Sequence, residues 1–146
     1  MKGVEDLFKE NDRLQKQVRH LRRDKAGFLE SKLKDQVQTL NGVNFLAVRM
    51  DESNALVKDL AFSMIRSDDK MFFLAGTHHE GKVTLTLAIG KELMDEKGMD
   101  AGKLIRDLAR EIDGGGGGQA HFATAGGSNS RGLEKALEKA RQTVEK

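Results

Sequence analysis

Two short apolar runs flank an amphipathic helix pattern near the middle of the chain, and this order constrains the fold more than any other feature. The run GVNFLAVRM, residues 42–50, and the run MFFLAGT, residues 71–77, are typical of buried strands. Between them, residues 51–66 begin with the capping residues Asp51 and Ser53 and place apolar side chains at helical spacing. A strand–helix–strand order predicts a parallel pair of strands joined by a crossover helix.

A third strand pattern follows after only four residues. Residues 82–90, KVTLTLAIG, alternate in polarity, which is typical of a strand with one covered face. The short connection HHEG, residues 78–81, predicts a hairpin, so this strand runs antiparallel to the one before it. The rest of the chain supplies two helices and one short strand, at residues 100–112, 128–146 and 121–125. The sequence therefore predicts the α+β class, with a small mixed-sheet α/β domain over residues 41–146.

The first forty residues carry an apolar repeat of seven. Two series with this step are offset by three residues, as the a and d positions of a coiled coil are. Asn11 and Lys25 occupy two of the a positions, where a polar residue weakens the seam but can fix its register. We expect a long, coiled-coil-like helix over residues 3–39, and two domains, 1–40 and 41–146. The helix pairs either with a second copy, giving a homodimer, or with an upstream helix, through Val4, Leu7, Leu14, Val18, Leu21 and Phe28.

The same helix carries the main charge asymmetry of the chain. From Arg13 to Lys25, six cations stand against one acid, Asp24, whereas the whole chain has a net charge of only +2. Such a run is typical either of a contact with a nucleic-acid backbone or of the solvated flank of a coiled coil, and the pattern alone leaves both open. The absence of Trp and Tyr argues against extensive base stacking. The cations are Arg13, Lys16, Arg19, Arg22, Arg23 and Lys25.

Composition and motifs argue against several classes of protein. No apolar run approaches the length of a membrane span, and the charged N-terminus does not resemble a secretory signal. The chain has no Cys, which excludes thiolate zinc sites and fits the cytosol. His78 and His79 are adjacent on a predicted turn, a poor arrangement for binding one metal ion. We therefore expect no metal ligands and no catalytic residues in this chain.

The stretch DGGGGGQAHFATAGGSN, residues 113–129, contains five consecutive glycines. Glycines can adopt positive φ and form a concave loop of N–H groups that binds anions, and the helix N-terminus that follows also favours phosphate. The alternative is a flexible linker, although the apolar segment FATA is unusual for a tether. In the first case the expected ligand contacts are Gly116, Gly117, Gly118, Gln119, His121 and Arg131.

This stretch resembles the glycine-rich signature near the end of alanyl-tRNA synthetases. Gly116, Gly117 and Gly118 match the glycine triplet of that signature, and residues 123–127 match its Ala-x-Ala-Gly-Gly ending. The segments VNFLAVRMD, EGKVTLTLAIGKEL and DAGKLIRDLAREI fit as well, so the resemblance covers the whole chain. More distantly, the chain is similar to the domain that follows the catalytic half of DHH-type phosphoesterases. The sequence departs from the signature at Asp113, Gly115, Gln119, Ala120 and His121.

The resemblance implies that the chain is the C-terminal piece of a longer ligase that charges tRNA with alanine. The ATP, magnesium and zinc used by that family belong to its catalytic and editing parts, so this piece is expected to hold no cofactor and to be non-catalytic. The resemblance to the family's C-terminal domain implies that this piece binds the elbow of tRNA(Ala), links the two active sites of the ligase and aids dimerisation. It also implies a cytoplasmic location.

This resemblance favours an RNA contact for the basic helix and a shaped loop for the glycines. Whether that loop holds phosphate or is structural stays open. Two alternatives also remain, a phosphate-binding or nucleotide-binding domain of a DHH-type phosphoesterase and a pure oligomerisation module.

Overall fold

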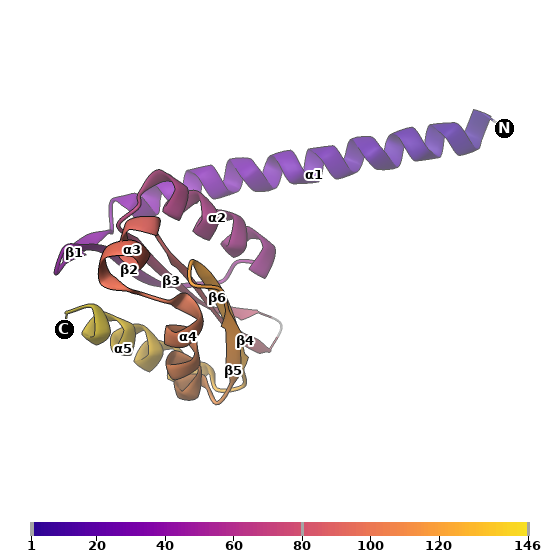
Figure 1. The fold of residues 1–146 in the computed structure, drawn as a ribbon. Helices are drawn as coiled ribbons and strands as arrows, with labels where there is room; N and C mark the ends of the chain where they lie inside the picture. Colours follow the sequence, from indigo (N-terminus) through magenta and orange to yellow (C-terminus); the bar gives the residue numbers. More distant parts are fainter. Residues whose placement is uncertain (1, 80, 146) are drawn as a thin grey trace.

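The computed structural model describes the backbone of residues 2–79 and 81–145, and the side chains of residues 10–17, 25, 27–78 and 81–145. A six-stranded mixed sheet forms the centre of the molecule, with helices on both of its faces (Figure 1). In chain order the elements are α1 (Lys2–Lys34), β1 (Gln38–Leu40), β2 (Val43–Met50), α2 (Asn54–Ser67), β3 (Met71–His79), β4 (Lys82–Ile89), α3 (Lys91–Lys97), α4 (Ala101–Ala109), β5 (Gly115–Gly118), β6 (Phe122–Gly127) and α5 (Leu133–Glu145), with short 3₁₀ turns at Arg110–Ile112 and Ser130–Gly132.

The sheet has the strand order β1-β2-β3-β4-β6-β5. The pair β2–β3 is parallel and is joined by the crossover helix α2, while the other neighbouring pairs are antiparallel. Both the parallel pair and the β3–β4 hairpin were predicted from the hydrophobic pattern. The order leaves β1 and β5 at the two edges, so the glycine run lies at a sheet edge.

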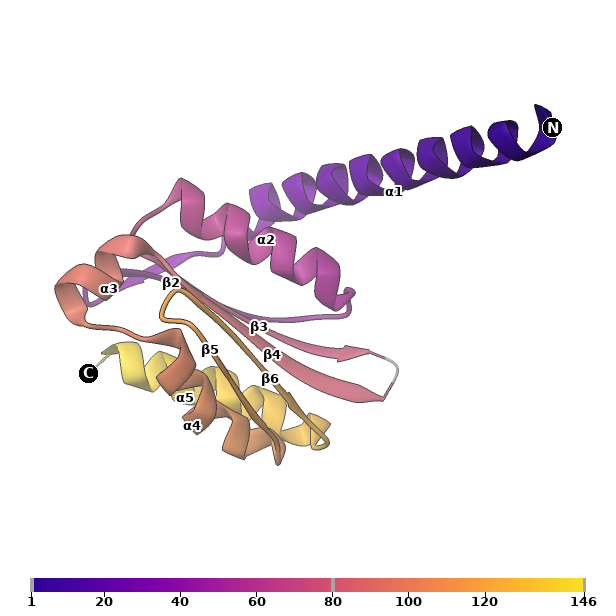
Figure 2. The same ribbon diagram turned by 45° about the vertical axis from the view of Figure 1, so that its right-hand side comes forward.

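Alternation along the strands divides the core between the two faces of the sheet. Val83, Leu85, Leu87 and Ile89 of β4 pack on the face that α4 and α5 cover, and Ala88 packs on the face that α2 covers. Figure 2 shows the same arrangement, with α2 on one side of the sheet and α4 and α5 on the other. Near the β5 edge, a hollow lies between α2 and the sheet, and Phe122 is only half-buried there.

Helix α4 lies directly on the strands that hold the glycine run. Its N-terminus is capped by Asp100, whose side chain accepts a hydrogen bond from the Lys103 N–H. Gly102 is buried, and a Cβ atom added to it would lie 2.8 Å from the Gly118 carbonyl oxygen. The helix backbone therefore approaches the strand more closely than a side chain at this position would allow.

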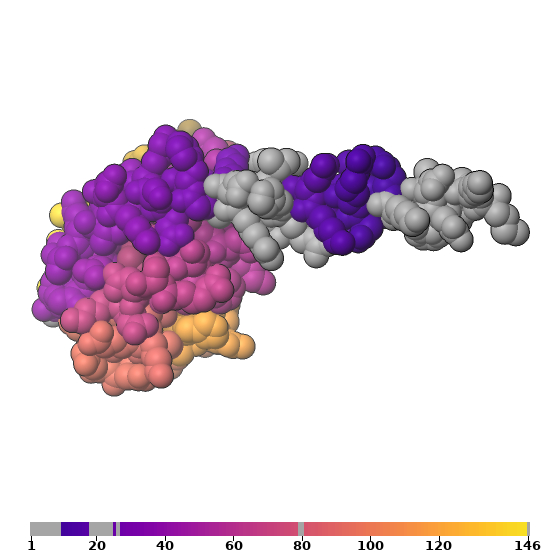
Figure 3. Space-filling view, turned by 90° about the horizontal axis from the view of Figure 1, so that it is seen from above, coloured from indigo at the N-terminus to yellow at the C-terminus, as the bar shows by residue number. Residues whose placement is uncertain are grey.

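The N-terminal helix α1 projects from the body of the molecule, as Figures 1 and 3 show. Only its last turns join the core, where Leu33 is 8% exposed and packs with residues of α2. A hydrogen bond from Ser63 Oγ to Glu30 Oε2, 2.5 Å long, ties the same turns to α2. Leu14 and Phe28, both expected on a coiled-coil seam, are 48% and 61% exposed.

The expected fold class is corrected in two places. First, the N-terminal segment is not a coiled-coil unit, because in the described part of the chain its helical neighbour is α2, reached only by its last turns. The helix also ends at Lys34, and residues expected to continue it form β1 instead. The boundary between residues 40 and 41 stays a prediction.

The second correction concerns the glycine-rich loop, which is a strand. Residues Gly115–Gly118 pair with Gly126, Ala125, Thr124 and Ala123 of β6. Among the described residues, glycines with positive φ occur at Gly42, Gly81 and Gly98 and not within the run. The glycines therefore do not form the concave anion-binding loop that positive φ values would produce.

Candidate nucleic-acid interface

The edge strand β5 presents a backbone with no side chains at all. Gly115, Gly116 and Gly118 are exposed, and in the described structure no further strand covers the outer edge. Unpaired N–H and C=O groups at such an edge are available to a partner. An incoming chain can also approach this backbone closely, because no Cβ atom stands in its way.

A basic stripe on α4 and the turn after it runs beside this edge. We define the α4 stripe as Lys103, Arg106 and Arg110, which are spaced by three and four residues, on one helix face, and are all exposed. The Nε atom of Arg106 lies 3.6 Å from the position that a Cβ atom on Gly117 would occupy. In the described part of the chain, none of the three side chains takes part in an ion pair. The stripe therefore offers three cations without ion pairs in the described structure next to the bare strand, in a segment, residues 100–113, that also carries Asp100, Asp107, Glu111 and Asp113.

On the other side of the strand, a hollow of about 310 Å³ lies between α2 and the β5–β6 hairpin. Three half-buried aromatic rings gather there. The rings of Phe62 and Phe122 stack with their centroids 4.6 Å apart, and the His121 ring lies 6.2 Å from that of Phe62. We call this the aromatic hollow; its lining consists of Lys58, Phe62, Gly117, Gly118, Gln119, His121, Phe122, Ala123 and Thr124.

The structure brings together some of the residues predicted to bind RNA. Gly117, Gly118, Gln119 and His121 line the aromatic hollow, and Gly116 lies in the same strand. Arg131 is exposed in the 3₁₀ turn before α5, away from the hollow's lining.

The cations predicted on α1 form a separate group. Arg13 pairs with Glu10, Lys16 with Asp12, and Lys25 with Glu52, at 2.6, 3.1 and 2.8 Å. RNA would have to compete with these carboxylates, although exposed ion pairs of this kind contribute little free energy. The side chains of Arg19, Arg22 and Arg23, and those of Val4, Leu7, Val18 and Leu21, lie outside the described residues.

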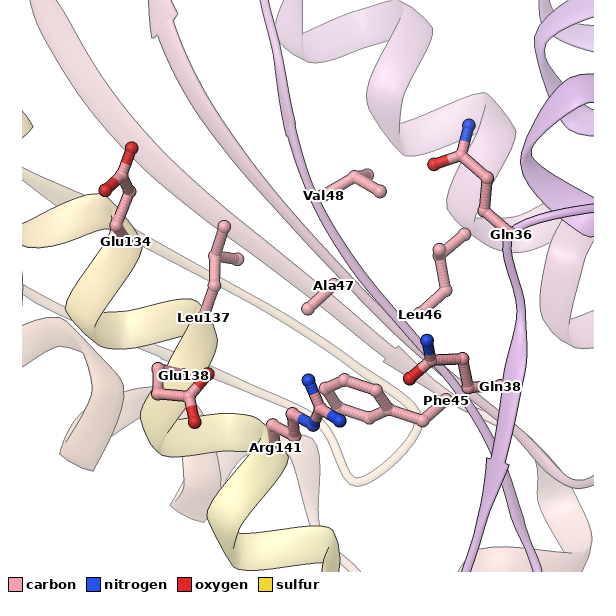
Figure 4. Close-up of a pocket in the computed structure, with 10 residues that line it drawn as sticks. All are labelled: Gln36, Gln38, Phe45, Leu46, Ala47, Val48, Glu134, Leu137, Glu138 and Arg141. Carbon is pink, nitrogen blue, oxygen red and sulfur yellow. The ribbon is translucent and has the colours of Figure 1, made fainter.

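A second hollow, of about 350 Å³, lies between β2 and α5 on the opposite side of the sheet. Figure 4 shows its apolar base, to which Phe45 and Ala47 of β2 contribute, and the α5 side chains that border it. Two of these are the carboxylates Glu134 and Glu138. Because they repel phosphate, this hollow is a poor candidate for a nucleic-acid site.

The described residues show neither a metal site nor a helix that could span a membrane. No group of three or more His, Cys, Asp or Glu side chains among them is arranged to hold a metal ion. His78 is exposed near the end of β3, and the side chain of His79 lies outside the described residues. None of the described helices is both long enough and apolar enough to cross a membrane.

The family model of the DHHA1 domain matches residues 42–146, which include the whole sheet except β1. The chain belongs to the DHHA1 domain family. This DHHA1 domain chain is 45% identical over 144 residues to an alanine–tRNA ligase of Christiangramia forsetii, and 39% identical over 139 residues to one of Bacteroides fragilis. These alignments cover 99% and 94% of the chain but only 16% of each relative, so the chain spans about a sixth of their length.

Two solved structures share the fold of this DHHA1 domain. The C-Ala domain of alanyl-tRNA synthetase from Aquifex aeolicus matches with a TM-score of 0.69 and 19% identity, over 75% of this chain and 98% of that one. The DHH domain of a member of the s1p family of ribosomal proteins matches with a TM-score of 0.52 and 14% identity, over 85% of this chain and 32% of that one. Together with the ligase relatives, the first match confirms the resemblance that the glycine signature indicated.

Sequence reasoning missed the α4 stripe and the α2 side of the aromatic hollow. The signal for the stripe was present, because Lys103, Arg106 and Arg110 fall on the polar face of a predicted amphipathic helix. Lys58 and Phe62 gave no comparable signal. Their role depends on the neighbouring hairpin, which is about sixty residues away in sequence and close only in the folded domain.

Proposed function

We propose that this DHHA1 domain binds tRNA through the outer edge of β5 and the α4 stripe, as the C-terminal part of an alanine–tRNA ligase. One observation carries the proposal: a strand without side chains lies beside three exposed cations that have no ion-pair partner among the described residues. Phosphate is the ligand that suits this combination, because backbone N–H groups and guanidinium groups both donate hydrogen bonds to its oxygens. The names of the relatives support tRNA as the source of that phosphate.

The elbow of tRNA(Ala) is the proposed binding region, in keeping with the resemblance stated for the glycine signature. Contacts of this kind go mainly to the RNA backbone and depend on its shape, since the α4 stripe offers charge rather than a pattern that would distinguish bases. Binding should therefore weaken steeply as salt is added. The cations predicted on α1 would extend the same contact, but the α4 stripe should contribute more than Arg13, Lys16 and Lys25, which are paired with carboxylates.

The test combines three substitutions, Lys103→Ala, Arg106→Ala and Arg110→Ala, in one variant. Binding of tRNA(Ala) is measured by filter retention over a range of salt concentrations. Each lost phosphate contact should reduce the slope of log affinity against log salt by about 0.7–0.9, so the variant should lose about two units or more. A matched control removes three exposed cations from other elements, Arg49, Lys91 and Lys135, and should keep most of the slope.

Equal slopes for the α4 variant and the wild type would refute the proposed interface. If both triple variants lost the same slope, the binding would reflect net charge and not this surface. A third variant, with Arg19, Arg22 and Arg23 changed to Ala, tests the prediction made for the basic helix. Protection of the tRNA elbow in footprinting, lost in the α4 variant, would identify the region of the tRNA that is bound.

Homodimerisation is proposed on the exposure of Leu14 and Phe28, which a second copy would bury. Sedimentation velocity at micromolar concentration should show a dimer, and changing both residues to Asp should give a monomer with unchanged helix content by circular dichroism. A wild-type protein that sediments as a monomer contradicts this proposal. The same assignment to a tRNA ligase implies a cytoplasmic location and leaves ATP, magnesium and zinc to the other parts of such a ligase.

A further inference from the structure

We propose that the aromatic hollow receives an unpaired nucleobase of the RNA strand whose backbone lies along β5. This inference deepens the proposed function and depends on it for the source of the base. The hollow is lined on one side by α2 and on the other by the β5–β6 hairpin. Its volume of about 310 Å³ and its flat aromatic lining suit a planar ring system.

The aromatic rings are held in place by one another. Phe62 and Phe122 lie with an angle of 22° between their planes, and the His121 ring is tilted by 44° relative to Phe62. All three residues are half-buried, so the rings are fixed by packing but are still reached by solvent. A base that stacks on rings already ordered in this way loses little additional side-chain entropy, which is the usual advantage of such platforms.

Polar groups around the hollow favour a nucleic acid over an apolar protein side chain. The exposed Lys58 lies one helical turn before Phe62, and the exposed Arg66 lies one turn after it and donates from Nε to the Phe62 carbonyl oxygen, 3.2 Å away. These two cations make the electrostatic potential near the hollow more positive, which favours a polyanionic ligand whose phosphates lie along the neighbouring strand edge. The exposed Gln119 amide at the hairpin can both donate to and accept from the edge of a base.

The hollow is continuous with the proposed backbone track. Gly117 and Gly118 line the hollow and also form the bare edge, and the Arg106 side chain lies beside Gly117. An RNA strand can therefore keep its phosphates near the α4 stripe and turn one base across the edge toward Phe62. The base must be unpaired, because bases within a duplex are already stacked and their faces cannot be reached.

The experiment compares two single-stranded probes of about ten nucleotides, oligoadenylate and an oligomer with the same sugar–phosphate backbone but no bases. Wild-type protein should bind oligoadenylate about five- to a hundredfold more tightly. The Phe62→Leu variant keeps an apolar contact with Phe122 and should bind the two probes with nearly equal affinity. Leu137→Ala, at a half-buried residue that lines the hollow between β2 and α5, is the control and should keep the full ratio.

Two outcomes would overturn the proposal: equal binding of the two probes by wild-type protein, or an unchanged ratio in Phe62→Leu. Should Phe62→Leu unfold in urea at a much lower concentration, His121→Ala takes its place, with the same two outcomes. The α4 triple variant should lose affinity for both probes by the same factor. If the α4 triple variant loses no affinity while oligoadenylate still binds more tightly than the base-free probe, the proposed phosphate contacts along β5 are wrong and the base site is supported. Tighter binding of free AMP than of oligoadenylate would contradict an RNA base as the ligand.

Discussion

The glycine run allows a test in which neighbouring residues of the same type give opposite results. A Cβ atom on Gly118 would lie 2.5 Å from the Phe122 carbonyl oxygen and 2.7 Å from Ala123 Cα, both in β6. A Cβ atom on Gly116 would come even closer to Thr124 and Ala125 of β6. These neighbours are backbone atoms, so only a shift of the strands could make room. A Cβ atom on Gly115 would meet nothing within 4 Å, and one on Gly117 would meet only the end of the Arg106 side chain.

The expected free energies follow from these contacts. Gly116→Ala and Gly118→Ala should each destabilise the domain by about 1–3 kcal/mol, the usual cost of forcing an extra carbon atom into packed structure. Gly115→Ala and Gly117→Ala should be neutral or stabilise it by about 0.4–1 kcal/mol, because Ala restricts the unfolded chain at positions whose φ it can adopt. The first pair should therefore lose a sizeable part of a typical stability of about 5–15 kcal/mol.

Urea unfolding of the four single variants, followed by circular dichroism, measures these differences directly. The diagnostic result is an alternation along the strand, with losses at Gly116 and Gly118 and none at Gly115 and Gly117. Four variants with the wild-type midpoint would mean that the run is a linker. If Gly115→Ala or Gly117→Ala lost as much stability as Gly116→Ala, backbone conformation and not contact with β6 would exclude side chains from this strand. That result would refute the packing explanation.

Two further stability predictions concern the elements that position the interface. Glu30→Ala should lower the free energy of unfolding by about 1–3 kcal/mol, because it removes the charged acceptor of the Ser63 hydroxyl. Lys34→Ala removes only a half-exposed ion-pair partner of Glu30 and should stay within about 1 kcal/mol of wild type, both measured by urea unfolding. Asp100→Ala should lower the stability of the domain by about 0.5–2 kcal/mol, because α4 loses its N-terminal cap. The control Asp95→Ala, at an exposed residue of α3, should leave the stability in thermal unfolding close to that of wild type.

Strong periodic patterns predicted the centre of the sheet. In β4, alternation assigned Val83, Leu85, Leu87 and Ile89 to one face, and all four are buried there against the α4 and α5 side. The same kind of pattern located α2, whose cap residue Ser53 accepts a hydrogen bond from the Leu56 N–H. These elements were predictable because their large apolar side chains recur with a fixed period, although Thr86 and Ala88, on the other face of β4, are buried as well.

The two edge strands were missed for different physical reasons. Glycine has no side chain, so β5 shows no alternation, and it is a strand only because β6 pairs with it. For β1 the sequence does carry a signal. Asn41 and Gly42 have φ values of 52° and 76°, as a tight hairpin turn between β1 and β2 requires, and Asn-Gly is a strong sequence marker of such turns. The apolar residues before them also fit the spacing of the N-terminal helix, which predicts that this helix continues there.

The candidate site shows the same limit. Sequence analysis found the glycines, Gln119 and His121 because they are contiguous, and it found the cations of α1 because they form a run. The α4 stripe and the α2 residues Lys58 and Phe62 belong to the site only through the sheet order, which places β6 and β5 beyond β4. A single sequence carries no direct signal for that order.

Packing within the domain explains only half of the glycines in β5. Gly116 and Gly118 are required because their neighbours in β6 leave no space for a Cβ atom. Gly115 and Gly117 have no such constraint, and neither has a positive φ that would favour glycine. A strand that needed only close packing could carry side chains at these two positions, where they would also shield the edge from unwanted pairing. The proposed close approach of RNA to this outer edge would account for their absence, and it supplies a reason for glycine that the folded domain does not.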